Sequence, residues 1–244
     1  MSEEGLESRR RAREVQSGAT RAAVLGFSDG LVTNVSLILG VAGAQASGRF
    51  VLLAGLASLV AGACSMAVGE YVSMNAQVEF LQGLLADFRD HLAREPEHAR
   101  QDLEEIVRRS GVSPATAVNA SLQITQVPDR ALEVYARSLG MDPEELGSPW
   151  KAAFTSLSTF AAGAAVPLLP WFFTQGPRAA AASLALGVVA ALTVGAVLGR
   201  LAGRNPSGSA VRQLAALCIA AAATWGAGRL FNVCLLYTSD AADE

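Results

Sequence analysis

Five long apolar segments constrain the fold of this chain more than any other feature. A helix needs roughly 20 apolar residues to cross the hydrocarbon core of a bilayer. Inside a bilayer every backbone amide needs a partner within the protein, which a helix provides. The pattern therefore predicts an all-α membrane protein with five transmembrane helices, at Ala22–Ala46, about 50–74, about 150–173, Ala179–Leu201 and about 209–233.

The composition also favours a membrane protein. Of the 244 residues 51% are hydrophobic and only 17% are charged, whereas a soluble domain carries about 25% charged residues. The net charge of −3 gives no reason to expect a nucleic-acid partner. The lipid bilayer is the partner that the composition predicts.

The charged residues lie mainly in polar segments outside the apolar ones. We divide the chain into an N-terminal segment (1–21), transmembrane helices one and two (22–74), an insert (75–149), helices three to five (150–233) and a tail (234–244). Within the insert, apolar spacing predicts a helix at Gln77–Arg94. Prolines 96, 114 and 128 open three more helices, because proline is favoured in the first turn. The insert is therefore predicted to be a small helical domain.

The arginines predict the orientation in the membrane. They are concentrated in the N-terminal segment, in the insert and in the connection between the last two apolar segments. The alternate connections contain one arginine each, Arg49 and Arg178. Cytosolic loops carry the excess of arginine and lysine, so the N-terminus and the insert are predicted to be cytosolic.

Asp29 is an acidic residue two helical turns inside the first apolar segment. A carboxylate there costs about 2.5–3.5 kcal/mol on insertion scales, and such residues usually face a bundle interior or an ion path. Thr33 and Ser36 follow at i+4 and i+7 on the same helix face, with Asn34 beside them. The alternative is that Thr33 and Ser36 bond to their own backbone while Asp29 caps the helix near the interface.

The second apolar segment carries a thioether, a carboxylate and a second thioether in successive turns: Met66, Glu70 and Met74. Mg²⁺ prefers all-oxygen ligands, whereas sulfur with a carboxylate suits a softer divalent ion such as Fe²⁺, with Mn²⁺, Co²⁺ or Zn²⁺ as alternatives. Methionines at helical spacing are also common in ordinary helix packing. The glycines of the apolar segments fit either close packing within one subunit or a dimer interface.

The insert offers a weaker candidate metal site. Asp87 and His91 are one helical turn apart and could chelate a divalent ion, although charged stripes are more often solvated helix faces. The three cysteines form no C-x-x-C pair, so neither a zinc site nor a disulfide framework is indicated. No catalytic motif occurs. We expect neither enzymatic activity nor a cofactor.

Two motifs resemble the vacuolar iron transporter (VIT) family: G-F-S-D-G-L-V-T-N-V-S-L-I-L-G-V-A-G in the first segment and A-G-A-C-S-M-A-V-G-E-Y-V-S in the second. The resemblance extends from about Arg21 to Val233 and includes D-P-E-E-L-G-S-P-W and G-R-L-F. It implies a homodimer of five-helix subunits, with a metal path between the two first helices. It also implies proton-coupled export of Fe²⁺, and often Mn²⁺, from the cytosol, so that metal ions and protons are substrates.

The resemblance assigns the pathway aspartate to Asp29 and the pathway methionine to Met66. A further glutamate of the plant and fungal branch falls on Ser58 and is missing, and our hypothesis is that Glu70 replaces it. In the insert, the family's metal-gathering glutamates and methionines fall largely on residues that do not bind metal. His91 and Asp102 are the exceptions, so the insert is expected to be degenerate, with Asp87, His91 and Asp102 as its remaining candidate ligands.

The leading hypothesis is therefore a divalent metal transporter of bacterial type in a bacterial plasma membrane. The competing hypothesis is a membrane scaffold that transports nothing and binds a partner through its cytosolic helices. A third possibility is passive cation conduction. Residues 234–244 do not resemble the family, and we expect a non-native tail there, without a function.

Overall fold

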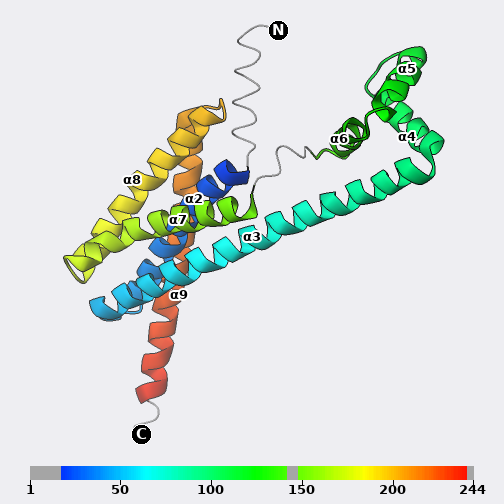
Figure 1. Ribbon diagram of the computed structural model, residues 1–244. Coiled ribbons are helices and arrows are strands. Elements are labelled where there is room, and N and C mark those ends of the chain that lie inside the picture. The colour runs from blue at the N-terminus through cyan, green and yellow to red at the C-terminus, as the bar shows by residue number, and fades with distance from the viewer. Residues whose placement is uncertain (1–17, 142–147, 241–244) are drawn as a thin grey trace. The chain divides into compact units, whose positions relative to one another are not determined.

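The computed structural model describes residues 18–141 and 148–240, with side chains for residues 22–141 and 148–230. Within these ranges the regular structure is helical and no strand occurs, which confirms the predicted all-α class. The chain divides into two compact units, Met1–Glu70 with Trp150–Glu244, and Tyr71–Pro149. The helix labels below are those of Figure 1.

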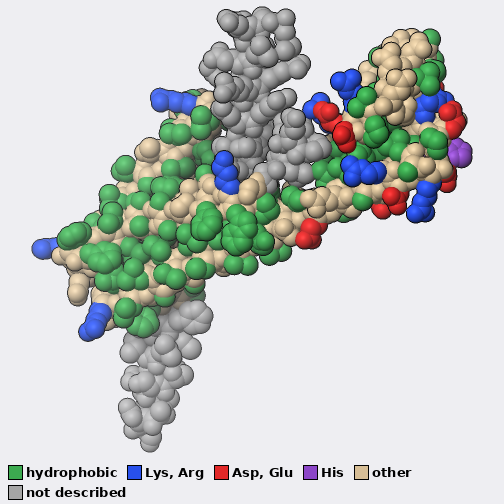
Figure 2. All heavy atoms as spheres, viewed as in Figure 1, with side chains coloured by type: hydrophobic (Ala, Val, Ile, Leu, Met, Phe, Trp, Pro, Cys, Tyr) green, Lys and Arg blue, Asp and Glu red, His purple; other side chains and the backbone are tan. Residues whose placement is uncertain are grey.

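The first unit contains five helices that are long and apolar enough to cross a membrane, as predicted. Its outward-facing side chains include large apolar ones, such as Leu53, Val189 and Ile219, which are 56%, 61% and 71% exposed. Figure 2 shows hydrophobic side chains across its visible face, with basic side chains toward the edges. The chain is an integral membrane protein, with spans in α2 (Gly18–Gly43), α3 (Gly48–Arg94), α7 (Pro149–Leu168) with the 3₁₀ helix η1 (Leu169–Phe172), α8 (Pro177–Leu201) and α9 (Pro206–Asp240).

Helix α3 differs from the prediction, because it continues without a break from the second span into the second unit. The apolar spacing predicts a separate helix from Gln77. Nothing between Met74 and Gln77 stops the helix, since neither glycine nor proline occurs there. Asn75, a possible helix cap, instead donates a 2.7 Å hydrogen bond from Nδ2 to Glu79 Oε1 one turn later.

The end of α7 tightens into η1 because two prolines, Pro167 and Pro170, remove backbone donors. A side chain of α8 bonds to the backbone there. Ser183 Oγ donates a 2.6 Å hydrogen bond to the Pro167 carbonyl, and Trp171 Nε1 donates a 2.9 Å bond to Ser183 Oγ. These bonds are buried, as polar groups in a membrane interior require. They fix the start of α8 against the end of α7.

Helices α2 and α7 run parallel, with their backbones in direct contact. Going along α2, Gly26 lies beside Ser156 and Gly30 lies beside Phe160. A β-carbon on Gly163 of α7 would overlap the Phe27 carbonyl oxygen and lie 3.0 Å from the amide nitrogen of the next α2 turn. Small residues allow such approach between membrane helices, where lipid provides no hydrophobic driving force.

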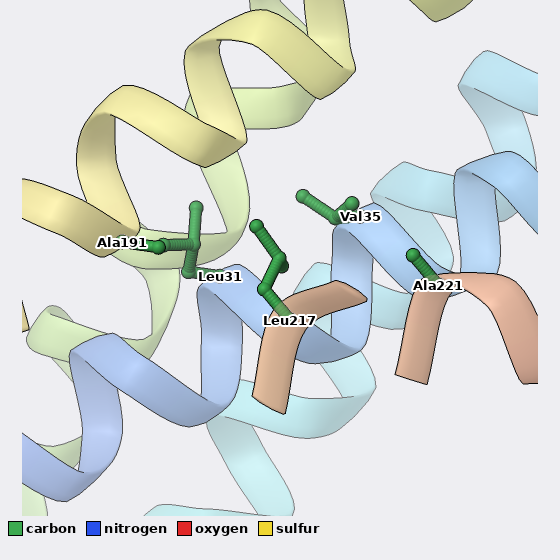
Figure 3. Packing of buried hydrophobic residues seen from close by; sticks show 5 residues of the cluster. All are labelled: Leu31, Val35, Ala191, Leu217 and Ala221. Atoms are coloured by element: carbon green, nitrogen blue, oxygen red, sulfur yellow. The ribbon is translucent and has the colours of Figure 1, made fainter. Parts of the chain in front are cut away.

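Helix α2 also packs against α9 and α8. A β-carbon on Gly40 would lie 3.1 Å from the Thr224 carbonyl oxygen of α9, and one on Gly187 of α8 would lie 2.9 Å from Val35. Figure 3 shows the hydrophobic cluster between the three helices, formed by Leu31, Val35, Ala191, Leu217 and Ala221. Of the glycines in the first, second and fourth spans, all but Gly69 contact neighbours within this subunit.

Helix α2 ends in a Schellman motif whose αL residue is Gln45, with φ of 61°. Its amide donates to the Ala42 carbonyl, and the Ala46 amide donates to the Val41 carbonyl. Helix α8 ends in the same motif with Gly203, whose φ is 63°. Glycine adopts this conformation without steric cost, whereas glutamine does not. The end of α2 is therefore strained, whereas the end of α8 is not.

The second unit packs the later part of α3 against three short helices around a hydrophobic core. Each short helix begins with proline, as predicted, and Ser113 Oγ accepts a 3.3 Å hydrogen bond from the Thr116 amide at the start of α5. Phe88 of α3 stacks on Tyr135 of α6, with ring centroids 4.0 Å apart and planes 3° apart. The short helices are α4 (Pro96–Arg109), α5 (Pro114–Thr125) and α6 (Pro128–Ser138).

The contact between α2 and α7 predicts that Gly163→Ala destabilises the first unit. The added methyl group meets backbone atoms, which yield little, so we expect a loss of about 1–3 kcal/mol. Gly226→Ala in α9 is the matched control, because a β-carbon at that position would have no described atom within 4 Å. Thermal unfolding in detergent should show a lower midpoint for Gly163→Ala alone. Equal midpoints for the two variants would contradict the close packing.

The strained end of α2 predicts that Gln45→Gly stabilises the first unit by about 1 kcal/mol, because glycine removes the steric cost of the αL conformation. The reverse change in the matching motif, Gly203→Gln, should lower the stability by a similar amount. Thermal unfolding of the two purified variants measures both changes in stability. A lower midpoint for Gln45→Gly would show that the glutamine side chain contributes more than its backbone costs.

Candidate functional site

The candidate site lies on the uncovered face of α2. Asp29 and Thr33 are both exposed there, one turn apart. Thr33 Oγ1 donates a 3.2 Å hydrogen bond to Asp29 Oδ1. The threonine therefore bonds to the carboxylate rather than to its own backbone, which was the alternative considered from sequence. The pair presents a carboxylate with a defined orientation on the outside of an apolar span.

An open groove between α2 and α9 continues from this pair, with a volume of about 690 Å³. Thr33 and Ser36 line it from α2, and Thr224 and Gly228 line it from α9. Ser36 is buried, and its Oγ has no hydrogen-bond partner among the described residues. The structure thus keeps Asp29, Thr33 and Ser36 on one side of α2, where the spacing placed them.

Asn34 lies on a different side of α2, facing α7. It is fully buried, and its Nδ2 donates a 2.6 Å hydrogen bond to the Ala164 carbonyl. Its Oδ1 has no partner in the described part of the chain. The helical spacing predicts Asn34 beside the Asp29 stripe and does not predict its contact with α7. An amide inside an apolar span was the available signal, because such a group needs a polar partner.

Met66, Glu70 and Met74 follow one another along α3 but have different surroundings. Met66 is half-buried and packs against the α7 side of the cluster formed by Ala63, Phe160 and Ala164. Glu70 is half-buried and is the last α3 residue of the first unit. Met74 is 5% exposed and belongs to the second unit. Within the first unit, Met66 and Glu70 are the α3 candidates for a metal path.

In the second unit the structure brings two of the three candidate insert ligands together. His91 Nε2 of α3 lies 3.3 Å from Asp102 Oδ2 of α4. Asp87 is exposed one turn before His91. Among the described residues no three histidine, cysteine, aspartate or glutamate side chains are grouped to hold a metal ion. Phe88 and Ala99, where the resemblance places two of the family's glutamates, are buried in the hydrophobic core.

The carboxylates of α4 are paired with arginines. Arg100 donates to Glu97, to Glu104 and, across to α5, to Ser121 Oγ at 3.2 Å. The hydrogen bond from Arg100 lowers the pKa of Glu97, and the bonds that Arg100 donates to both glutamates raise the pKa of Arg100. Arg108 and Arg109 likewise lower the pKa of Glu105 through hydrogen bonds. A metal ion would have to displace these arginines.

The chain is similar to known membrane transporters. The model of the VIT family matches residues 20–229. The chain is similar to vacuolar iron transporter homolog 1 of Oryza sativa subsp. japonica, with 36% identity over 222 residues, 87% of this chain and 74% of the relative. It is also similar to vacuolar iron transporter 1 of Eucalyptus grandis, with 30% identity over 91% of this chain and 90% of the relative. These plant proteins, named for the vacuole, do not support the predicted bacterial plasma membrane.

We predict that the hydrophobic core of the second unit holds its fold together and that no metal ion is needed. Phe88→Ala should destabilise it by about 3–5 kcal/mol, because a buried ring and its stack on Tyr135 are lost. Phe80→Ala is the matched control on the same helix, since Phe80 is 63% exposed. Hydrogen exchange of residues 96–138 in the full chain should increase for Phe88→Ala alone, and should be unchanged by a metal chelator. An increase with the chelator would contradict this prediction.

Proposed function

Because this chain belongs to the VIT family, we propose that it exports divalent metal ions, Fe²⁺ and secondarily Mn²⁺, from the cytosol in exchange for protons. Members of this family are transporters and not enzymes. Iron is the metal in the names of the plant relatives. Metal ions and protons are substrates in this proposal, and the chain uses no cofactor.

The observation that carries the proposal is the exposed Asp29–Thr33 pair on α2. A carboxylate facing lipid is unfavourable by several kcal/mol. The cost falls when the carboxylate faces a second polar surface or a water-filled path. A hydrogen bond from Thr33 orients the carboxylate but leaves its second oxygen available. Asp29 is therefore the residue that we assign to binding the transported metal.

A second copy of the chain supplies the missing surface in this proposal. The groove between α2 and α9 is open, and its lining is mostly small or apolar, as in contacts between membrane helices. Two copies that meet through this face of α2 bring two Asp29 carboxylates toward a shared path. The homodimer also removes the exposed carboxylate from lipid.

Met66 and Glu70 of α3 account for the choice of ion. A thioether favours softer ions such as Fe²⁺ over Mg²⁺, which prefers oxygen ligands and keeps its water. Met66 is half-buried, so part of this residue remains accessible from outside the bundle. Glu70 stands one turn further toward the second unit, where an ion entering from the cytosol arrives first.

Proton exchange follows from the chemistry of a single carboxylate. A carboxylate oxygen binds a proton or a metal ion, so protonation of Asp29 releases metal and metal binding releases a proton. The direction rests on the arginine distribution, which places the N-terminus and residues 75–149 in the cytosol. A proton gradient that is acidic on the far side then drives the metal outward.

The proposal predicts that Asp29→Asn abolishes Fe²⁺ flux in proteoliposomes, because an amide binds metal ions and protons far more weakly than a carboxylate does. Thr33→Val removes the hydrogen bond to Asp29 and should lower the flux about tenfold. Thr224→Val is the matched control. It lines the same groove, but its hydroxyl donates to the Ala220 carbonyl of its own helix, so we expect the flux to be unchanged.

The same assay separates the three hypotheses. Flux that needs a pH gradient supports exchange, whereas equal flux with and without the gradient indicates passive conduction. Absence of flux for Fe²⁺, Mn²⁺, Co²⁺ and Zn²⁺ in well-folded wild-type protein would favour the scaffold. Full flux in Asp29→Asn, with the oligomeric state unchanged by size-exclusion chromatography, would remove Asp29 from the mechanism.

A further inference from the structure

A second cavity of the first unit is unrelated to the proposed metal path. It has a volume of about 400 Å³ and lies between the ends of α2 and η1, the start of α8 and a middle turn of α9. Its walls are apolar side chains, including Leu39, Ala42 and Ala180, and the indole rings of Trp171 and Trp225. Gln45 contributes the amide among these lining residues.

The cavity lies at the level of the membrane interface. It is bordered by two connections, after α2 and before α8, where the apolar spans end. Both connections lie at the same end of the bundle, because α2 and α7 run parallel. Tryptophan is enriched at this depth, where one part of the ring contacts lipid tails and the other contacts headgroups. A ligand here meets both environments.

A cation lies over one of the tryptophans that line the cavity. The guanidinium carbon of Arg229 lies 5.6 Å from the centroid of the Trp225 ring, one turn earlier on α9. Arg229 is exposed, and no carboxylate among the described residues pairs with it. Trp225 is half-exposed, and its indole packs against Gly43 of α2. The ring therefore connects an apolar cavity with an uncompensated positive charge.

The glutamine at the rim is held at a steric cost. Gln45 occupies the αL position that glycine occupies at the end of α8. Residues that keep such strain often belong to binding surfaces. Its side chain adds a hydrogen-bond donor to a rim that otherwise consists of apolar groups and two indoles. The rim thus offers hydrogen-bond donors, Arg229 adds a positive charge next to the lining residue Trp225, and no acidic side chain lines the cavity.

We propose that this cavity binds an anionic phospholipid, with one acyl chain inside the cavity and the phosphate on Arg229. The apolar walls match the acyl chain, and the exposed guanidinium matches the phosphate in charge. Arginine forms strong charge-assisted hydrogen bonds with phosphate oxygens. One basic residue near an anionic membrane surface contributes about a fivefold preference for anionic over zwitterionic lipid. The site does not depend on the proposed metal transport.

The test measures lipid retained by the full chain in detergent, using native mass spectrometry with dioleoyl phosphatidylglycerol and dioleoyl phosphatidylcholine. Wild type should prefer phosphatidylglycerol about fivefold. Arg229→Gln should bind both lipids equally. Arg49→Gln is the matched control, because Arg49 is an exposed arginine at the same end of the bundle but, unlike Arg229, has no described contact with a tryptophan that lines the cavity. An unchanged preference in Arg229→Gln would overturn the assignment of the phosphate.

A second variant tests the acyl chain. Ala42→Phe fills the cavity and should lower the retention of both lipids, while Gly226→Ala, on the same bundle, should not. If Ala42→Phe fails to fold, tryptophan fluorescence provides the test. Phosphatidylglycerol with brominated acyl chains should quench the tryptophan fluorescence of wild type more strongly than that of Trp225→Phe. Equal quenching would overturn the proposal. So would a loss of dimer in Ala42→Phe with lipid retention unchanged, because the cavity would then be a contact between copies.

Discussion

Direct backbone contact of α2 with its neighbours is the constraint on which the rest of the first unit depends. Gly30 and Gly163 allow α2 and α7 to touch, and Gly40 and Gly228 do the same for α2 and α9. Apolar area contributes little to association in lipid, so the number of atoms in contact decides which helices pair. Glycines at these crossings make α2 the central helix of the bundle.

This packing also fixes where the carboxylate of Asp29 points. Successive residues of a helix are about 100° apart, so the glycine at position 30 facing α7 directs Asp29 away from that helix. Asn34 strengthens the same register by donating to the Ala164 carbonyl. A rotation of α2 by one residue would bury Asp29 against α7 and expose Gly30. The glycines therefore serve the proposed function indirectly, by holding the uncovered face in place.

The helices could be predicted because their signals are local. Apolar length defined the five spans, and proline defined the starts of α4, α5 and α6. The continuity of α3 was missed because a change from apolar to polar composition does not itself end a helix. The separation of Asn34 from Asp29 and the pairing of His91 with Asp102 depend on contacts between helices. Spacing along one helix does not contain that information.

The second unit shows that carboxylates differ in how available they are to a metal ion. Its α4 helix is rich in glutamate, yet Arg100 forms ion pairs with Glu97 and Glu104, and two further arginines form ion pairs with Glu105. A divalent ion binding there would displace a charge-assisted hydrogen bond for each ligand that it gains. Asp29 has no such competitor, since its hydrogen-bond partner among the described residues is the neutral hydroxyl of Thr33. The difference in neighbouring cations, rather than the number of carboxylates, is what favours the membrane helix as the proposed metal-binding site.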